Sequence, residues 1–154
     1  MGDAQKYYFP TGGLPGQKEV MTQRAVFTEA YAVIPKGTMR DIVTSFLPHW
    51  DKTRAWVLAR PLSGFAETFS QYIMEVSPGG GSRKPDADAR AQSVLFVTQG
   101  AGVLHLDGQA HALRAGSYAY IPSSVQWKLE APGDFLRYQW IRKIYVPVEG
   151  IEKP

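Results

Sequence analysis

The sequence predicts an all-β protein, a jelly-roll barrel (a double-stranded β-helix) preceded by an irregular N-terminal arm. Aromatic residues are abundant, with four Trp, eight Tyr and seven Phe, and these residues favour strands. The 15 Gly and 11 Pro residues supply turns for many short strands. About ten short apolar runs lie between turn signals, and no segment of useful length has a helical period. This pattern is typical of a sandwich or closed barrel.

The 154 residues suffice for one domain with its own core. Residues 1–23 are expected to form the arm, which is punctuated by Pro and Gly. Residues 24–146 are expected to form a single barrel, and residues 147–154 a linker-like tail. The expected strands are 25–34, 40–46, 53–59, 66–76, 94–97, 103–106, 109–113, 118–121, 125–129 and 135–144.

Turn residues set the expected breaks between these strands. Residues 77–81 and 100–102 are glycine-rich and are expected to end one strand before the next begins. Residues 48–51 are expected to break the chain as well, and residues 82–91 to form a long polar loop. Asp107–Gly108 is a strong two-residue hairpin signal.

Composition excludes several classes of protein. The chain has no Cys, so disulfides and Cys-ligated zinc are excluded. No run approaches the ~18 apolar residues of a membrane span, and the N-terminus lacks the apolar core of a signal peptide. The net charge is +3 and its basic residues are scattered rather than gathered in a stripe. We therefore expect a cytoplasmic protein that binds neither nucleic acid nor membranes.

The segment from Pro78 to Trp127 resembles the two sequence motifs of the cupin superfamily. The first motif opens on a PGG turn at 78–80 and closes on VLFVTQG at 94–100. The second corresponds to LRAGSYAYIP at 113–122. The resemblance is fairly specific, since the turn glycines and the strand-ending proline fall in register. It implies a cupin-type barrel.

A closer resemblance covers nearly the whole chain. The sequence is similar to the N-terminal cupin half of (S)-ureidoglycine aminohydrolases, also known as glyoxylate-induced proteins. The supporting segments are residues 24–26, 66–78, 95–100, 116–122 and, most specifically, RKIYVPVEG at 142–150. The resemblance implies a bicupin that uses manganese to release ammonia from ureidoglycine in purine (allantoin) catabolism. It places the manganese ligands in the second cupin.

The residues of this chain agree with metal ligands that lie in the second cupin. A cupin metal site needs about three His and one carboxylate. The chain has only His49, His105 and His111, none of them between residues 81 and 92. Gln92 and Trp127 stand where the motifs usually place a Glu and a His. We expect no metal, no cofactor and no catalytic residue in this chain.

A metal-free barrel can still bind a small molecule. Gln92, Tyr72, Tyr120 and Trp127 are the candidate pocket residues, because they offer amide, hydroxyl and indole groups from the two motifs. The alternative is that these side chains simply pack the core, as aromatic residues often do in small barrels.

Three functional hypotheses follow. The first is an assembly domain that forms a homo-oligomer, pairs with a C-terminal cupin partner, or does both. The second is a metal-independent module that binds a small ureide or carboxylate, with Arg83, Lys84 or Arg90 meeting the carboxylate. The third is a metal-dependent enzyme with atypical ligands, for which Asp86, Asp88, His105 and His111 are available, the two histidines as neighbours on one face of a hairpin.

Overall fold

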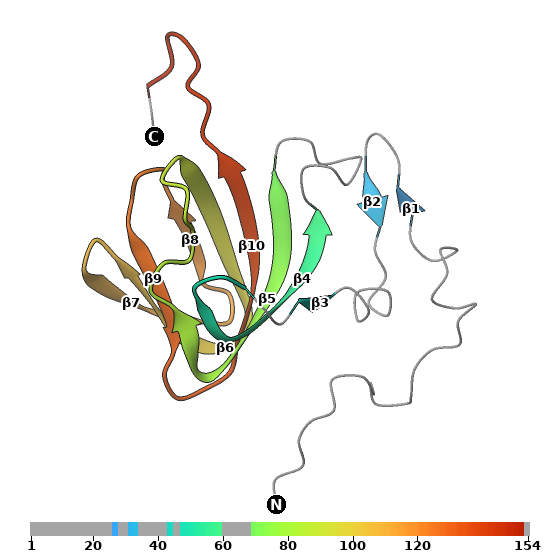
Figure 1. The fold of residues 1–154 in the computed structure, drawn as a ribbon, viewed down its shortest axis with the longest axis vertical. Coiled ribbons are helices and arrows are strands. Elements are labelled where there is room, and N and C mark those ends of the chain that lie inside the picture. The colour runs from blue at the N-terminus through green and yellow to red at the C-terminus, as the bar shows by residue number, and fades with distance from the viewer. Residues whose placement is uncertain (1–25, 28–30, 34–42, 45–46, 60–68, 153–154) are drawn as a thin grey trace, which may run out of the picture.

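The computed structural model describes residues 26–27, 31–33, 43–44, 47–59 and 69–152, and it confirms an all-β cupin fold. Figure 1 shows the strands curving into a barrel. A separate pair consists of β1 (Val26–Phe27) and β2 (Ala32–Val33). The barrel strands are β3 (Val43–Thr44), β4 (Trp50–Ala59), β5 (Ser70–Ser82), β6 (Ala91–Leu106), β7 (Gln109–Arg114), β8 (Tyr118–Ile121), β9 (Trp127–Ala131) and β10 (Leu136–Ile144).

Two long strands, β5 and β6, connect the two sides of the barrel. The first part of β5 pairs with β4 and β10, and its last residues also pair with β9. The first part of β6 pairs with β10 and β8, and its second part pairs with β7 and β9. One side is therefore ordered β8-β6-β10-β5-β4-β3, and the other contains β7, β9 and the far ends of β5 and β6.

The predicted breaks at 77–81 and 100–102 are wrong, because both segments continue their strands. Glycine bends the strand there instead of ending it. Gly100 has φ +80°, and a Cβ atom at this position would lie 1.7 Å from the Phe135 carbonyl oxygen. At Gly81 (φ +142°) a Cβ would lie 2.1 Å from the Leu129 oxygen. Only glycine allows these close backbone approaches at the corners of the barrel.

Other predicted elements are confirmed or corrected in detail. The Asp107–Gly108 turn joins β6 to β7, and the loop after β5 spans 83–90. The break expected at 48–51 is too long, since β4 already begins at Trp50. Half of the strand expected at 25–34 and most of the strand expected at 40–46 lie outside the described residues, and the arm at 1–23 does so entirely. The described tail residues, 147–152, belong to no strand, and the domain boundaries stay a prediction.

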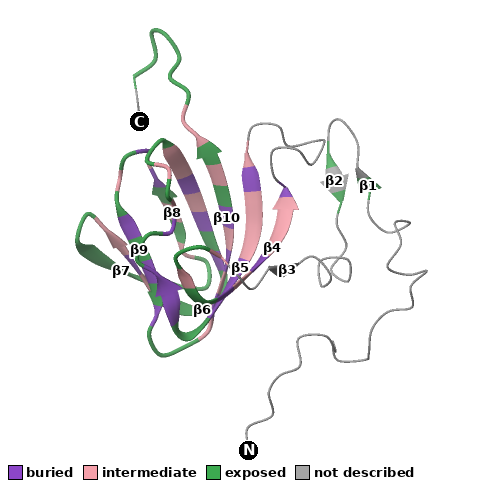
Figure 2. Ribbon diagram, viewed as in Figure 1, coloured by how far each residue is buried: buried purple, intermediate pink, exposed green. Residues whose placement is uncertain are grey.

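The core lies inside the barrel. Buried residues alternate with more exposed ones along β9 and in the first half of β10, as Figure 2 shows by colour, because successive strand residues point to opposite faces. The largest fully buried side chains are Tyr138, Met74, Leu95, Leu104, Ile121, Leu129, Leu136, Val76 and Val97. The part of the chain that the structure describes contains no helix of the length and apolar character needed to cross a membrane.

Candidate functional site

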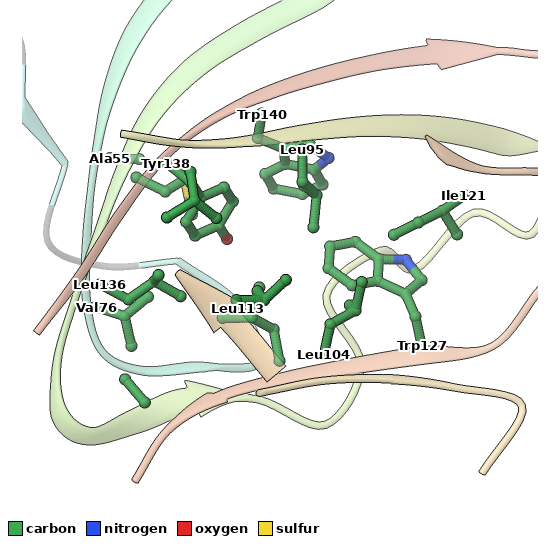
Figure 3. Packing of buried hydrophobic residues seen from close by; sticks show 14 residues of the cluster. Ala55, Val76, Leu95, Leu104, Leu113, Ile121, Trp127, Leu136, Tyr138 and Trp140 are labelled. Atoms are coloured by element: carbon green, nitrogen blue, oxygen red, sulfur yellow. The ribbon is translucent and has the colours of Figure 1, made fainter. Parts of the chain in front are cut away.

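Four aromatic side chains form a cluster inside the barrel, which we call the aromatic cluster: Trp50, Tyr72, Trp127 and Trp140. They come from β4, β5, β9 and β10, and therefore meet only when the barrel closes. The ring centroids of Trp140 lie 5.9 Å from Trp50, 5.5 Å from Tyr72 and 5.8 Å from Trp127. These separations and the tilted or edge-on angles are those that aromatic pairs prefer. Figure 3 shows Trp127 and Trp140 pointing inward among aliphatic side chains.

Two indole nitrogens anchor the aromatic cluster. Trp140 Nε1 donates a buried hydrogen bond of 3.0 Å to Ser93 Oγ. Trp50 Nε1 donates to the Pro85 carbonyl oxygen over 3.3 Å, and so connects β4 to the loop after β5. A buried indole N–H without an acceptor would cost free energy, so these bonds fix the orientation of both rings.

A cavity of about 190 Å³ lies beside three rings of the aromatic cluster, Trp50, Tyr72 and Trp140. Met74 from β5 also lines it, and the polar edge is formed by Asp86 and Arg142. Since Asp86 belongs to the 83–90 loop, the cavity lies where that loop meets the barrel.

Asp86 and Arg142 form a two-point ion pair at this edge. Arg142 Nη2 donates to Asp86 Oδ1 over 2.9 Å, and Arg142 Nε donates to Asp86 Oδ2. The backbone N–H of Asp88 also donates to Asp86 Oδ1, over 2.9 Å, which fixes the carboxylate from its own loop. The hydrogen bond to Asp86 is the main cause of a raised pKa at Arg142. The side chain of Asp86 is 10% exposed and that of Arg142 25%, so the pair is largely shielded from water.

The four candidate pocket residues do not meet in one place. Tyr72 lines the cavity, and Trp127 packs against Trp50 and Trp140 in the aromatic cluster. Tyr120 donates a hydrogen bond of 2.9 Å to Gln92 Oε1 at an exposed position. The inward residue of β6 next to Trp140 is Ser93 rather than Gln92, because alternate residues of a strand face opposite sides. Whether any of the four binds a ligand stays a prediction.

Sequence reasoning missed Trp50, Trp140 and the pairing of Asp86 with Arg142. Asp86 and Arg142 are 56 positions apart, and no local pattern connects them. Trp140 and Arg142 could have been found from the two-residue period of β10. This period places Tyr138, Trp140 and Arg142 on the same side of the strand.

The manganese that the resemblance implies for the second cupin would not fit the interior of this barrel. Trp127 is 7% exposed and fills its position with an indole, and Ser93 already accepts the Trp140 hydrogen bond. Within the described ranges, no three His, Cys, Asp or Glu residues gather closely enough to hold a metal ion. Neither an indole nor this serine belongs to the imidazole and carboxylate donors that such a site needs.

The atypical ligand set does not converge either. Asp86 pairs with Arg142, and Asp88 pairs with Arg90 over 2.8 Å. His105 Nε2 lies 2.7 Å from Glu130 Oε1 on the outside of the barrel. The idea that His111 shares a face with His105 is wrong, because His111 is opposite Leu104 whereas His105 is opposite Ala110.

A second feature is an exposed apolar surface on the outside of β6, β8 and β10, which we call the outer face. Its exposed members are Phe96, Tyr118, Tyr120 and Ile141, which are 45%, 65%, 38% and 38% exposed. Phe96 is opposite Tyr118 in the register of β6 and β8, and Val94 connects Tyr120 to Ile141. Residues opposite each other in antiparallel strands share a face, so these side chains form one patch. Contiguous apolar patches of this kind mark interaction sites.

Comparison with known proteins agrees with this architecture. The cupin domain family model matches residues 72–141. A crystal structure of a glyoxylate-induced protein from Pseudomonas aeruginosa is 59% identical, covers 85% of this chain and 49% of its own, and superposes with a TM-score of 0.76. The Ylba protein from E. coli is 22% identical, covers 88% of this chain and 55% of its own, and has a TM-score of 0.70, which supports the fold alone.

The barrel and the family match together show that the chain contains a cupin domain. Within the cupins it is related to the glyoxylate-induced proteins and to the (S)-ureidoglycine aminohydrolases. An (S)-ureidoglycine aminohydrolase of Oryza sativa subsp. japonica is 31% identical over 104 residues, which are 67% of this chain and 31% of that protein. The chain thus spans about half or less of the length of these relatives.

Proposed function

We propose that this chain is an assembly cupin, the half without a metal in a two-cupin arrangement of the ureidoglycine aminohydrolase type. Its partner is a second cupin barrel, on the same or on a separate polypeptide. That second barrel holds manganese and releases ammonia from ureidoglycine in purine (allantoin) catabolism in the cytoplasm. This chain supplies a rigid surface on which the second barrel docks.

The observation that carries the proposal is the outer face. Phe96 and Tyr118 stand opposite each other there with about half or more of their surface exposed. Burying such side chains in an interface removes apolar surface from water, at about 25 cal/mol per Å². Aromatic residues are also enriched in the cores of protein interfaces.

The composition of the interior supports the absence of chemistry in this half. Aromatic rings pack together inside the barrel, and Trp127 stands where the second motif usually has a His. The glyoxylate-induced protein that is 59% identical has about half its length beyond the part that this chain covers, which leaves room for a second barrel.

The test is reconstitution. The complete chain is mixed with the separately expressed second half of the 59% identical glyoxylate-induced protein, in the presence of Mn²⁺. We expect a complex by analytical ultracentrifugation, with ammonia released from ureidoglycine by the mixture and not by this chain alone. Ammonia release by the chain alone would overturn the proposal.

Matched variants locate the interface. Phe96→Glu and Tyr118→Glu place a charge on the outer face and are expected to abolish the complex, because a buried unpaired charge is costly. Gln109→Glu adds the same charge at an exposed position of β7 and should leave the complex intact. Complex formation that is unaffected by Phe96→Glu and Tyr118→Glu would show that the second barrel docks elsewhere.

A further inference from the structure

The cavity beside the aromatic cluster has the composition of a small-molecule site. Three of its walls are aromatic rings, from Trp50, Tyr72 and Trp140, and its edge is charged. Ligand sites are mostly lined by apolar and aromatic side chains, with a few polar groups that fix orientation. The indole N–H groups of Trp50 and Trp140 already have acceptors, so both rings are held in place before any ligand enters.

The charges at the edge select against charged ligands. Asp86 and Arg142 neutralise each other through two hydrogen bonds. The nearby Asp88 is itself paired with Arg90, through Arg90 Nε at 3.0 Å and Nη2 at 2.8 Å. An anion entering the cavity would be attracted by Arg142 but repelled by Asp86, and a cation the reverse. Aromatic rings attract an ammonium ion, but here the positive guanidinium of Arg142 repels it.

Hydrogen-bonding capacity remains at this neutral edge. Arg142 uses Nε and Nη2 for its bonds to Asp86, and among the described residues Nη1 donates no hydrogen bond. Within the described part of the chain, Asp86 Oδ2 accepts one hydrogen bond, so it can accept another. A ligand that offers both a carbonyl oxygen and an N–H group could use the two together.

The size of the cavity limits the ligand further. A volume of about 190 Å³ corresponds to about six water molecules at ~30 Å³ each, which is smaller than the sites that hold drug-sized molecules. One planar ring with a short substituent would fill it, and its faces would pack against the tryptophan rings.

We propose that this cavity binds a small, planar, uncharged molecule that carries an amide group, with the ring against Trp50 and Trp140 and the amide at Asp86 and Arg142. The site goes beyond the assembly role, since it lies where the 83–90 loop meets the barrel and the outer face takes no part in it. Loss of binding here would leave the reconstitution result unchanged, so the two proposals fail separately.

Three probes built on the same phenyl ring test the charge selectivity: neutral benzamide, anionic benzoate and cationic benzylammonium. Binding to the complete chain is measured by calorimetry and by intrinsic tryptophan fluorescence, because two tryptophans line the cavity. We expect benzamide to bind at least about ten-fold more tightly than either charged probe. Benzoate or benzylammonium binding as tightly as benzamide would overturn the proposal, as would the absence of benzamide binding at millimolar concentration.

Substitutions at the edge should invert the preference. Asp86→Asn leaves the Arg142 charge without its counter-ion, so benzoate should become the tightest of the three probes. Arg142→Gln leaves the Asp86 carboxylate, so benzylammonium should become the tightest. The two variants are complementary, so that one remains informative if near-ultraviolet circular dichroism shows the other to be unfolded.

Asp88→Asn is the matched control. It removes the same charge two positions away, from the carboxylate that pairs with the exposed Arg90. Its probe preferences should equal those of the unmodified chain. If Asp88→Asn shifts the preference as far as Asp86→Asn does, the selectivity comes from the general field of the loop and the assigned site is wrong.

Discussion

The Tyr138 hydroxyl is a buried group without a hydrogen bond, and its removal is a sharp test of the core. Tyr138 is 1% exposed, and its hydroxyl has no hydrogen-bond partner among the described residues. Figure 3 shows the oxygen among the buried side chains. An unpaired buried hydroxyl costs about 1–3 kcal/mol of desolvation, and Tyr138→Phe removes this cost while keeping the ring.

The expected gain can be estimated. The variant leaves a void the size of one oxygen atom, whose cost we take as below the ~0.8 kcal/mol of a buried methylene. The net expectation is a stabilisation of about 1 kcal/mol, and a rise in Tm of about 2–4 °C for a chain of this size. Urea unfolding and calorimetry measure the two quantities.

The effect should also depend on alkaline pH. Burial raises the pKa of Tyr138 well above its ordinary value of about 10. Above pH ~10 the unfolded chain loses this proton and the native chain keeps it, so wild-type stability falls by up to about 1.4 kcal/mol per pH unit from this group. The Phe variant lacks this loss, and its advantage should widen as the pH rises.

The control is Tyr118→Phe, at a tyrosine that is 65% exposed, where the change should stay within about 0.5 kcal/mol. A Tyr138→Phe variant that is less stable than wild type by about 1 kcal/mol or more would refute the reasoning, because the hydroxyl would then have a stabilising partner. Parallel pH curves for the two proteins above pH ~10 would refute the second part.

Three further predictions concern single positions. Gly100→Ala should destabilise the fold by more than about 3 kcal/mol in urea unfolding, because φ is +80° and a Cβ would lie 1.7 Å from a carbonyl oxygen; a loss below about 1 kcal/mol would contradict this. Ser93→Ala leaves the buried Trp140 N–H without its acceptor and should cost about 1–3 kcal/mol, whereas an unchanged Tm would show another acceptor. The side-chain hydrogen bond from Arg90 lowers the pKa of Asp88 to about 2. The stability that this pairing contributes is therefore fully present above the unfolded pKa of about 3.9 and is lost as the pH falls through about 2. Arg90→Gln should move the NMR titration of Asp88 back toward its ordinary value, and an unmoved midpoint would exclude the pairing.

The sequence predicted the fold well because its signals are local. The turn at Asp107–Gly108 and the apolar alternation of β9 and β10 each depend only on residues close together in the sequence. The same local reading failed at 77–81 and 100–102, where glycine marks a bend within a strand. A glycine that ends a strand and one that turns it are identical in sequence, and only the partner strand tells them apart.

The candidate site could be predicted only in part. Tyr72 and Trp127 were named from the motifs and do face the interior, whereas Gln92 and Tyr120 face outward. Gln92 was named for its place in the first motif, before the strand pairing was known. Successive residues of a strand face opposite sides, and in β6 it is Ser93 that faces the interior.

Composition and motifs alone predicted the all-β cupin fold, and they placed Gln92 and Trp127 where the motifs usually have a Glu and a His. These properties depend on which residues are present and on their local spacing. The tertiary structure alone decided that the tryptophans from β4, β9 and β10 meet, that Arg142 neutralises Asp86 across 56 positions, and that Phe96 and Tyr118 share an exposed face. Contacts between distant segments depend on how the strands pair, and strand pairing is a property of the closed barrel rather than of any single strand.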